Sequence, residues 1–273
     1  MTVVALGSVK ASPGVTTTML GLAAVWPSER PLLLVEADPD GGVLAARCSL
    51  RPEPGLATLA AAGRHSLDPE ELERHTQILP GGVSALVGPT DPDEARRAVD
   101  MAASRLVTTL AFRTGRDALL DCGRLGPHAP SWALVGQADA AVIVARPRLD
   151  ELQHVRARLH RLQPAARRPA LVLIGERPYP PDEVASALDV PVVGVIANDA
   201  SGAGALAGWG GRETRLRRSL LIRSAREVLA SLMAFARESC ESVVSPLSSP
   251  EPAQTGSDQQ RSDHESITTG THT

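Results

Sequence analysis

The sequence predicts an α/β protein with a doubly wound, mainly parallel sheet that is covered by helices on both faces. Continuous aliphatic runs at 3–6, 32–35 and 118–120 are typical of strands that are buried on both sides. These runs alternate along the chain with segments of helical periodicity, and parallel strands require such crossover helices. We expect about seven strands, as is common for this architecture, with the run at 3–6 near the centre.

The composition narrows the class of protein. The chain has 273 residues, 43% of them hydrophobic, but only 2% aromatic, so the core must be built from Leu, Val, Ala and Ile. Scarce aromatics also disfavour binding of single-stranded nucleic acid by base stacking. Cys48, Cys122 and Cys240 lack metal-ligand spacing, which indicates reduced thiols. No apolar run approaches the ~18 residues of a membrane span, and no signal peptide is evident, so we expect a cytoplasmic protein.

The first eighteen residues predict a buried strand, a loop of small residues and the first turn of a helix. Amides at such a helix N-terminus point outward and attract phosphate. The loop contains Lys10, the only lysine among 28 basic residues, and a compact ammonium suits phosphate oxygens in a way that arginine's planar fork does not. Taken alone, the loop also fits an ordinary strand-to-helix turn with a threonine cap, because a degenerate glycine loop is a weak signal.

Carboxylates follow the next two strands that this pattern predicts. The run at 32–35 ends in Glu36 and Asp38, and the run at 118–120 ends in Asp121. The carboxyl ends of parallel strands meet at one edge of the sheet, where open α/β sheets bind ligands, so we expect Lys10, Asp38 and Asp121 to converge there. A strand-terminal aspartate can hold magnesium-bound water. The alternative for Asp38 is a simple turn.

On these three motifs the chain resembles the ParA/MinD family of P-loop ATPases, whose deviant Walker A pattern is Lys-Gly-Gly-x-Gly-Lys-Thr-Thr. The resemblance covers residues 2–235. It implies that Lys10 is the family's signature lysine, that Asp38 helps to position the attacking water, and that Thr16 and Asp121 bind Mg²⁺. The loop that it implies for ATP consists of Lys10, Ala11, Ser12, Gly14, Val15, Thr16 and Thr17.

The loop departs from the family pattern at several positions. Ala11 and Ser12 replace glycines, and Val15 replaces the lysine that reaches the β- and γ-phosphates. Pro13 also removes an amide that could bind phosphate. The resemblance therefore implies a dimerising ATP switch in intracellular positioning or partitioning, with a protein cargo and with weak or lost hydrolysis. The alternative is a non-hydrolysing scaffold or assembly platform on the same fold.

The remaining elements continue the alternation. Between residues 51 and 112 we expect short helices at 55–62 and 69–75, a strand at 83–87 and a long helix at 92–112. In the second half we expect strands at 138–145, 169–174 and 190–196 and helices at 149–162 and 181–188. His65 and His75 have no partner at metal spacing and are expected to be solvated residues near helix ends. Ile174-Gly175-Glu176 stands where the family often places an asparagine beside the adenine.

A basic cluster opens the last predicted helix, at 213–237. It consists of Arg212, Arg215, Arg217, Arg218, Arg223 and Arg226. Such a cluster is either a solvated face or a surface that binds DNA without sequence specificity, as ParA-type dimers do near their C-terminal helices. We expect one domain at 1–238 and a disordered polar tail at 239–273. The tail lacks the basic amphipathic helix with which MinD proteins end, so we expect no direct membrane anchor.

Overall fold

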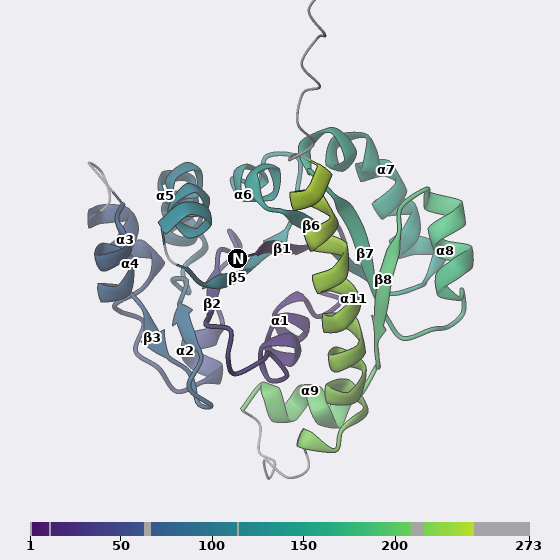
Figure 1. Cartoon of the computed structure of the whole chain (residues 1–273), viewed down its shortest axis with the longest axis horizontal. Coiled ribbons are helices and arrows are strands. Elements are labelled where there is room, and N and C mark those ends of the chain that lie inside the picture. Colours follow the sequence, from purple (N-terminus) through teal and green to yellow (C-terminus); the bar gives the residue numbers. More distant parts are fainter. Residues whose placement is uncertain (1, 11, 63–66, 114, 209–215, 243–273) are drawn as a thin grey trace, which may run out of the picture.

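The computed structural model describes residues 2–10, 12–62, 67–113, 115–208 and 216–242 (Figure 1). Several residues singled out by the sequence lie outside these ranges: Ala11, His65, Arg212 and Arg215. The predicted disorder of the tail stays a prediction, since residues 243–273 lie outside them too.

The predicted sheet is confirmed, and its strand order is β3-β4-β2-β5-β1-β6-β7-β8. The strands are β1 (Val3–Ser8), β2 (Leu32–Glu36), β3 (Gln77–Ile78), β4 (Ser84–Leu86), β5 (Asp117–Arg124), β6 (Ala140–Ala145), β7 (Pro169–Ile174) and β8 (Val192–Ile196). Every pairing is parallel except β3 with β4. The strand β1 lies centrally, with β5 and β2 on one side of it, as the aliphatic runs predict.

Helices cover both faces of this sheet (Figure 1). They are α1 (Val15–Ala23), α2 (Leu44–Arg47), α3 (Leu56–Ala62), α4 (Pro69–Arg74), α5 (Pro92–Arg113), α6 (Trp132–Gln137), α7 (Leu149–Ala165), α8 (Pro181–Leu188), α9 (Ala200–Leu206) and α11 (Leu220–Ser242). Val4 and Leu6 of β1 pack in one core with α1 and α11, whereas Val3 and Ala5 pack in the other with α3, α5, α6, α7 and α8. The aliphatic runs are unbroken because alternate side chains enter opposite cores.

The start of the last helix differs from the prediction. We expected it near residue 213, but α11 begins at Leu220, after Ser219 accepts a hydrogen bond from the amide of Ile222 at 3.2 Å. Arg217 and Arg218 therefore precede α11, whereas Arg223 and Arg226 lie within it. None of the helices that the structure describes combines the length and hydrophobicity needed to cross a membrane.

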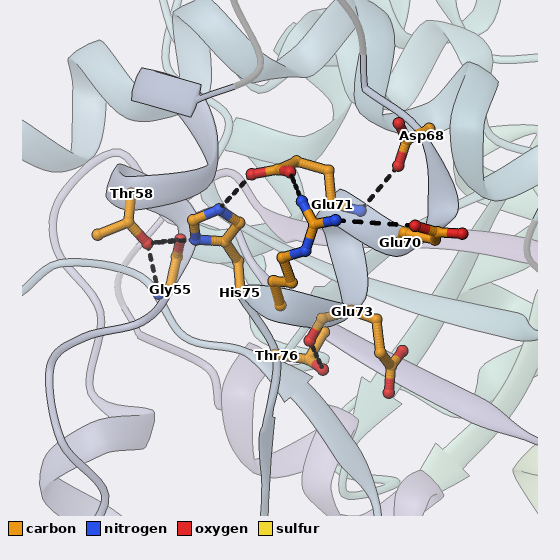
Figure 2. Close-up of polar contacts among 9 residues, drawn as sticks. Gly55, Thr58, Asp68, Glu70, Glu71, Glu73, His75 and Thr76 are labelled. Carbon is orange, nitrogen blue, oxygen red and sulfur yellow. Dashed lines mark hydrogen bonds and ion pairs between the residues drawn. The ribbon is translucent and has the colours of Figure 1, made fainter.

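His75 is another correction, because its side chain is only 13% exposed rather than solvated. Figure 2 shows it between Thr58 of α3 and Glu71 of α4. The ring Nδ1 lies 2.7 Å from Thr58 Oγ1, and Nε2 lies 3.0 Å from Glu71 Oε1. Asp68 caps α4 by accepting a hydrogen bond from the Glu71 amide. The histidine thus joins two helices that the sequence predicts as separate elements.

A bidentate ion pair lies at the amino ends of the strands, opposite the end of the sheet that carries the candidate site. Arg30 Nε lies 2.6 Å from Asp117 Oδ2, and Arg30 Nη2 lies 2.7 Å from Oδ1. Asp117 is 3% exposed and also accepts a hydrogen bond from the Thr2 amide. The pair joins the segment before β2 to the first residue of β5, and the Thr2 amide joins β1 to them, so it sets the register of the three strands that carry the site.

We predict that Arg30→Leu lowers the free energy of unfolding by about 3 kcal/mol, because it leaves a buried carboxylate without its partner. Urea denaturation measures this change. The matched control is Arg167→Leu, whose pair with Asp139 spans 3.7 Å at an arginine that is 62% exposed and should cost less than about 1 kcal/mol. Equal losses in the two variants would contradict the prediction.

Candidate functional site

The loop after β1 places the start of α1 at the carboxyl edge of the sheet. Gly14 is the N-cap of α1, with φ 112° and ψ 42°, a left-handed conformation that favours glycine. Its carbonyl accepts a hydrogen bond from the Thr18 amide at 2.8 Å, which closes the first turn of the helix. The other amides of that turn are free of intrahelical partners and can bind an anion. Within the same loop Lys10 and Ser12 are exposed.

Thr16 and Asp121, the two predicted magnesium ligands, lie together. Thr16 Oγ1 donates a hydrogen bond to Asp121 Oδ2 at 2.6 Å, which joins the first turn of α1 to the end of β5. The Gly123 amide donates to the other carboxylate oxygen at 3.0 Å. Hydroxyl and carboxylate oxygens are hard donors of the kind that Mg²⁺ prefers, and Mg²⁺ usually keeps several waters or phosphate oxygens besides one or two protein ligands. The pair therefore fits Mg²⁺.

Asp38 reaches the same edge from the turn after β2. Its Oδ1 accepts a hydrogen bond from the Asp40 amide at 2.9 Å. The carboxylate lies against the backbone of Gly123, where a Cβ would stand 2.0 Å from Asp38 Oδ1, and Gly123 also has φ +57°. A side chain at 123 would therefore displace Asp38. The sequence shows this glycine directly after Asp121-Cys122, but its contact with Asp38 depends on the pairing of β2 with β5.

Glu36 is a structural carboxylate of this edge. It is 1% exposed, and it accepts hydrogen bonds from the amides of Val43 at 2.6 Å, Leu44 at 2.9 Å and Gly88 at 2.9 Å. In the sheet register it stands opposite Asp121. Glu36 thus holds the loop that contains Asp38 and the start of α2, a role that the sequence does not show because its partners are backbone amides.

The two candidate carboxylates, Asp38 and Asp121, have raised pKa values. Burial raises the pKa of Asp121 to about 6, and the Thr16 hydroxyl and Gly123 amide oppose that rise by binding the ionised form. Burial also raises the pKa of Asp38 to about 6, and the negative charge of Asp121 contributes to it. Two partly desolvated carboxylates at one edge favour the arrival of a cation.

The loop position at which the ParA/MinD pattern has its phosphate-binding lysine is taken up by core packing in this chain. Val15 is 7% exposed and packs in the core with Val4 and Met19. Two arginines that sequence reasoning missed act on the carboxylates instead: the charge of Arg124 lowers the pKa of Asp38, and that of Arg47 lowers the pKa of Asp121. No pattern in the sequence identifies them, since each depends on how separate elements meet at the edge.

A groove of about 940 Å³ continues the edge toward β8. Its lining includes Arg146 after β6, Glu176 after β7 and Asn198 after β8, and α11 forms its far wall. Arg146 Nη2 lies 3.5 Å from the Ser12 carbonyl oxygen, so the groove adjoins the loop before α1. The segment Ile174-Gly175-Glu176, which stands where the ParA/MinD family often has an asparagine, therefore lines a groove next to that loop.

Comparison with solved structures identifies the fold as that of MinD and ParA-family ATPases. The cell division ATPase MinD of Pyrococcus furiosus matches with a TM-score of 0.70 and 18% identity, over 85% of this chain and 98% of that one. MinD of Pyrococcus horikoshii, complexed with Mg-ADP, matches with a TM-score of 0.70 and 18% identity, over 87% and 98%. An ATP complex of a D38A variant of Cyanothece McdA matches with a TM-score of 0.65 and 16% identity, over 85% and 96%. No family model and no curated protein matches the sequence.

Ionisation of Asp38 should destabilise the folded protein. Its pKa rises on folding from an ordinary value of 3.8 to about 6, so the folded state binds more protons between these values. The contribution of Asp38 to stability is therefore greatest below pH 3.8 and is lost as the pH rises through 6.

We predict that Asp38→Asn is more stable than the parent by about 1–2 kcal/mol at pH 8, which is less than the full shift implies because the side chain is partly open to water. The two proteins should converge near pH 4. Urea denaturation across this range tests the difference, with Asp40→Asn as the control because Asp40 is exposed on the same turn. A stability difference that does not change with pH would refute the assignment.

Proposed function

We propose that this chain binds ATP with Mg²⁺ at the carboxyl edge of β1, β2 and β5, and that it acts as a dimerising ATP switch with weak or lost hydrolysis. The observation that carries the proposal is the 2.6 Å hydrogen bond between Thr16 and Asp121, at the N-terminus of α1. It brings a hydroxyl and a carboxylate together beside the free amides of a helix. These are the groups that bind a magnesium-bound phosphate.

Each residue of the edge takes a role in this proposal. Thr16 and Asp121 hold Mg²⁺, and the amides from Gly14 to Thr17 contact the phosphates. The adenine occupies the groove beside Glu176. The bound nucleotide supplies the γ-phosphoryl group for transfer to water. The fold shared with MinD complexed with Mg-ADP and with the McdA–ATP complex supports the choice of ligand.

Asp38 orients the attacking water in this proposal. Its pKa of about 6 leaves it ionised at neutral pH, so the carboxylate can accept a hydrogen bond from water. Hydrolysis is slow because Val15 offers no charge to the γ-phosphoryl group, whose negative charge must be stabilised in the transition state. Ala11 and Ser12 in place of glycines restrict the loop further.

The switch works through a second copy of the chain. Lys10 is exposed on the loop and is able to reach the phosphates of a partner subunit. A MinC:MinD complex of Aquifex aeolicus shares the fold and supports assembly with a further protein, here a cargo of unidentified nature. We place this activity in the cytoplasm and in a single domain at 1–238. Intracellular positioning or partitioning is the process that such a switch would serve.

A non-hydrolysing scaffold is the second candidate. The burial of Val15 in the core favours it, because this position is committed to packing rather than to phosphate. The ATP switch and the scaffold differ in one expectation: a positive charge added to the loop should strengthen ATP binding only in the switch.

We predict that the combined variant Ala11→Gly, Ser12→Gly, Val15→Lys binds ATP about ten- to hundred-fold more tightly than the parent, the value of a charge-assisted hydrogen bond. The new side chain has to extend out of the core cluster, and the two glycines give the loop freedom to admit it. Calorimetry with Mg²⁺ measures the affinity. The control replaces Val15 with Met, which has length without charge. Lys10→Ala should abolish nucleotide-dependent dimerisation, measured by ultracentrifugation.

The scaffold candidate makes the opposite prediction for this series. If the folded triple variant binds no ATP, the edge is not a nucleotide site and the scaffold function stands.

We further propose that the basic cluster before and in α11 binds DNA without sequence specificity. Replacing Arg215, Arg217 and Arg218 with Ala should abolish retention on DNA and leave the melting temperature within about 2 °C, since Arg217 and Arg218 are exposed and exposed substitutions have small effects. Affinity of the parent should fall steeply with salt. The control replaces three exposed arginines elsewhere: Arg51, Arg97 and Arg156. Equal retention of the parent and the cluster variant would assign the cluster to a solvated face.

A further inference from the structure

Arg47, the last residue of α2, has a buried polar atom without a partner. Its Nη1 is closed to solvent and makes no hydrogen bond within the part of the chain that the structure describes. The residue as a whole is only partly buried. A desolvated guanidinium donor without an acceptor is costly. Such a group indicates a site that is completed by an anion.

The backbone of α2 is tied to the end of β2, next to the candidate site. The carboxylate of Glu36, opposite Asp121 in the sheet, binds the amides of Val43 and Leu44 and so fixes the first turn of α2 to the end of β2. The Arg47 amide donates to the Val43 carbonyl at 2.9 Å, one turn further along. Arg47 is therefore held within one helical turn of the residues whose amides bind the Glu36 carboxylate.

The end of α9 fixes α2 from the other side. At Gly208, where φ is +78°, a Cβ would lie 2.4 Å from the carbonyl oxygen of Arg47. The backbone of Arg47 is thus packed against a glycine that has no room for a side chain. With both of its ends restrained, α2 presents the guanidinium from a fixed backbone, which lowers the entropy cost of binding a ligand.

We propose that Arg47 is a phosphate-binding residue of this site and supplies the cationic contact to the terminal phosphates of the nucleotide that Val15 cannot provide. This inference rests on the proposed function, because it names a further ligand-binding residue of the same edge. A guanidinium can bind two phosphate oxygens at once, and it carries its charge at every relevant pH. The electrostatic effect of Arg47 on Asp121 supports its closeness to the metal-binding end of the site.

A purely structural role for Arg47 would be to neutralise Asp121. Among the described residues, however, no ion pair joins Arg47 to Asp121 or to any other carboxylate. The oxygens of Asp121 are taken up by Thr16 and by the Gly123 amide. Arg47 therefore lies near the carboxylates of this edge of the sheet without forming an ion pair with any of them. This is expected for a group that binds an anionic ligand.

The test compares Arg47→Gln and Arg47→Lys with the parent, using the full chain. Calorimetry measures the binding of pyrophosphate, Mg-ADP and Mg-ATP, and circular dichroism reports folding. We expect Arg47→Gln to weaken all three about ten- to hundred-fold, because one charge-assisted contact is lost. Arg47→Lys should retain part of the affinity, since it keeps the charge but loses the fork. Arg51→Gln, at an exposed arginine four positions along the chain, should bind like the parent.

Three outcomes overturn the proposal, and they are distinguishable. If the parent binds nucleotide and folded Arg47→Gln binds it equally well, Arg47 is not a phosphate ligand while the proposed function stands. If Arg47→Gln does not fold, the lysine variant decides, and affinities equal to the parent's for pyrophosphate and both nucleotides count against a bidentate contact. If the parent binds neither pyrophosphate nor nucleotide, the proposed function fails, and the role of Arg47 fails with it.

Discussion

Three backbone amides converge on the buried carboxylate of Glu36, and the geometry of the candidate site depends on this clamp. Through the amides of Val43 and Leu44 it closes the loop that carries Asp38, and through Gly88 it joins the end of β2 to the segment after β4. A carboxylate that is 1% exposed is tolerated here because the hydrogen bonds from three amides offset part of the desolvation that raises its pKa. The clamp is local in space but spans fifty-two positions of the sequence, from Glu36 to Gly88.

The same edge carries two further carboxylates, Asp38 and Asp121, whose hydrogen bonds, like those of Glu36, do not fully offset their burial. After burial, the charge of Asp121 contributes to the raised pKa of Asp38, and the charge of Glu36 contributes to the raised pKa of Asp121. Gly123 permits the close approach of Asp38 to the end of β5. Concentrated negative charge of this kind lowers stability in the free protein and is relieved when a cation binds, which is typical of functional sites.

Much of the fold can be predicted from the sequence because β1, β2 and β5 are buried on both sides, and such strands appear as unbroken aliphatic runs. Short elements were predicted less consistently, because so few residues barely establish a period: α3 and α4 were predicted, whereas α2, α6, α9 and β3 were not. The positions of Thr16, Asp38 and Asp121 follow from strand ends. The roles of Glu36 and Arg47 do not, because they depend on backbone amides and on packing between elements distant in sequence.

The placement of positive charge gives a physical reason why this chain could bind nucleotide without hydrolysing it efficiently. A lysine at position 15 would stand on α1 and contact the γ-phosphoryl group during its transfer, whereas Val15 packs in the hydrophobic core. Under our proposal the compensating charge comes from Arg47, on a short helix clamped to β2. A guanidinium on α2 approaches the phosphates from a different element than a lysine at position 15 would, so it can bind the ground-state phosphates without stabilising the charge that develops during transfer. Affinity for nucleotide would then survive the loss of the loop lysine, while turnover would not.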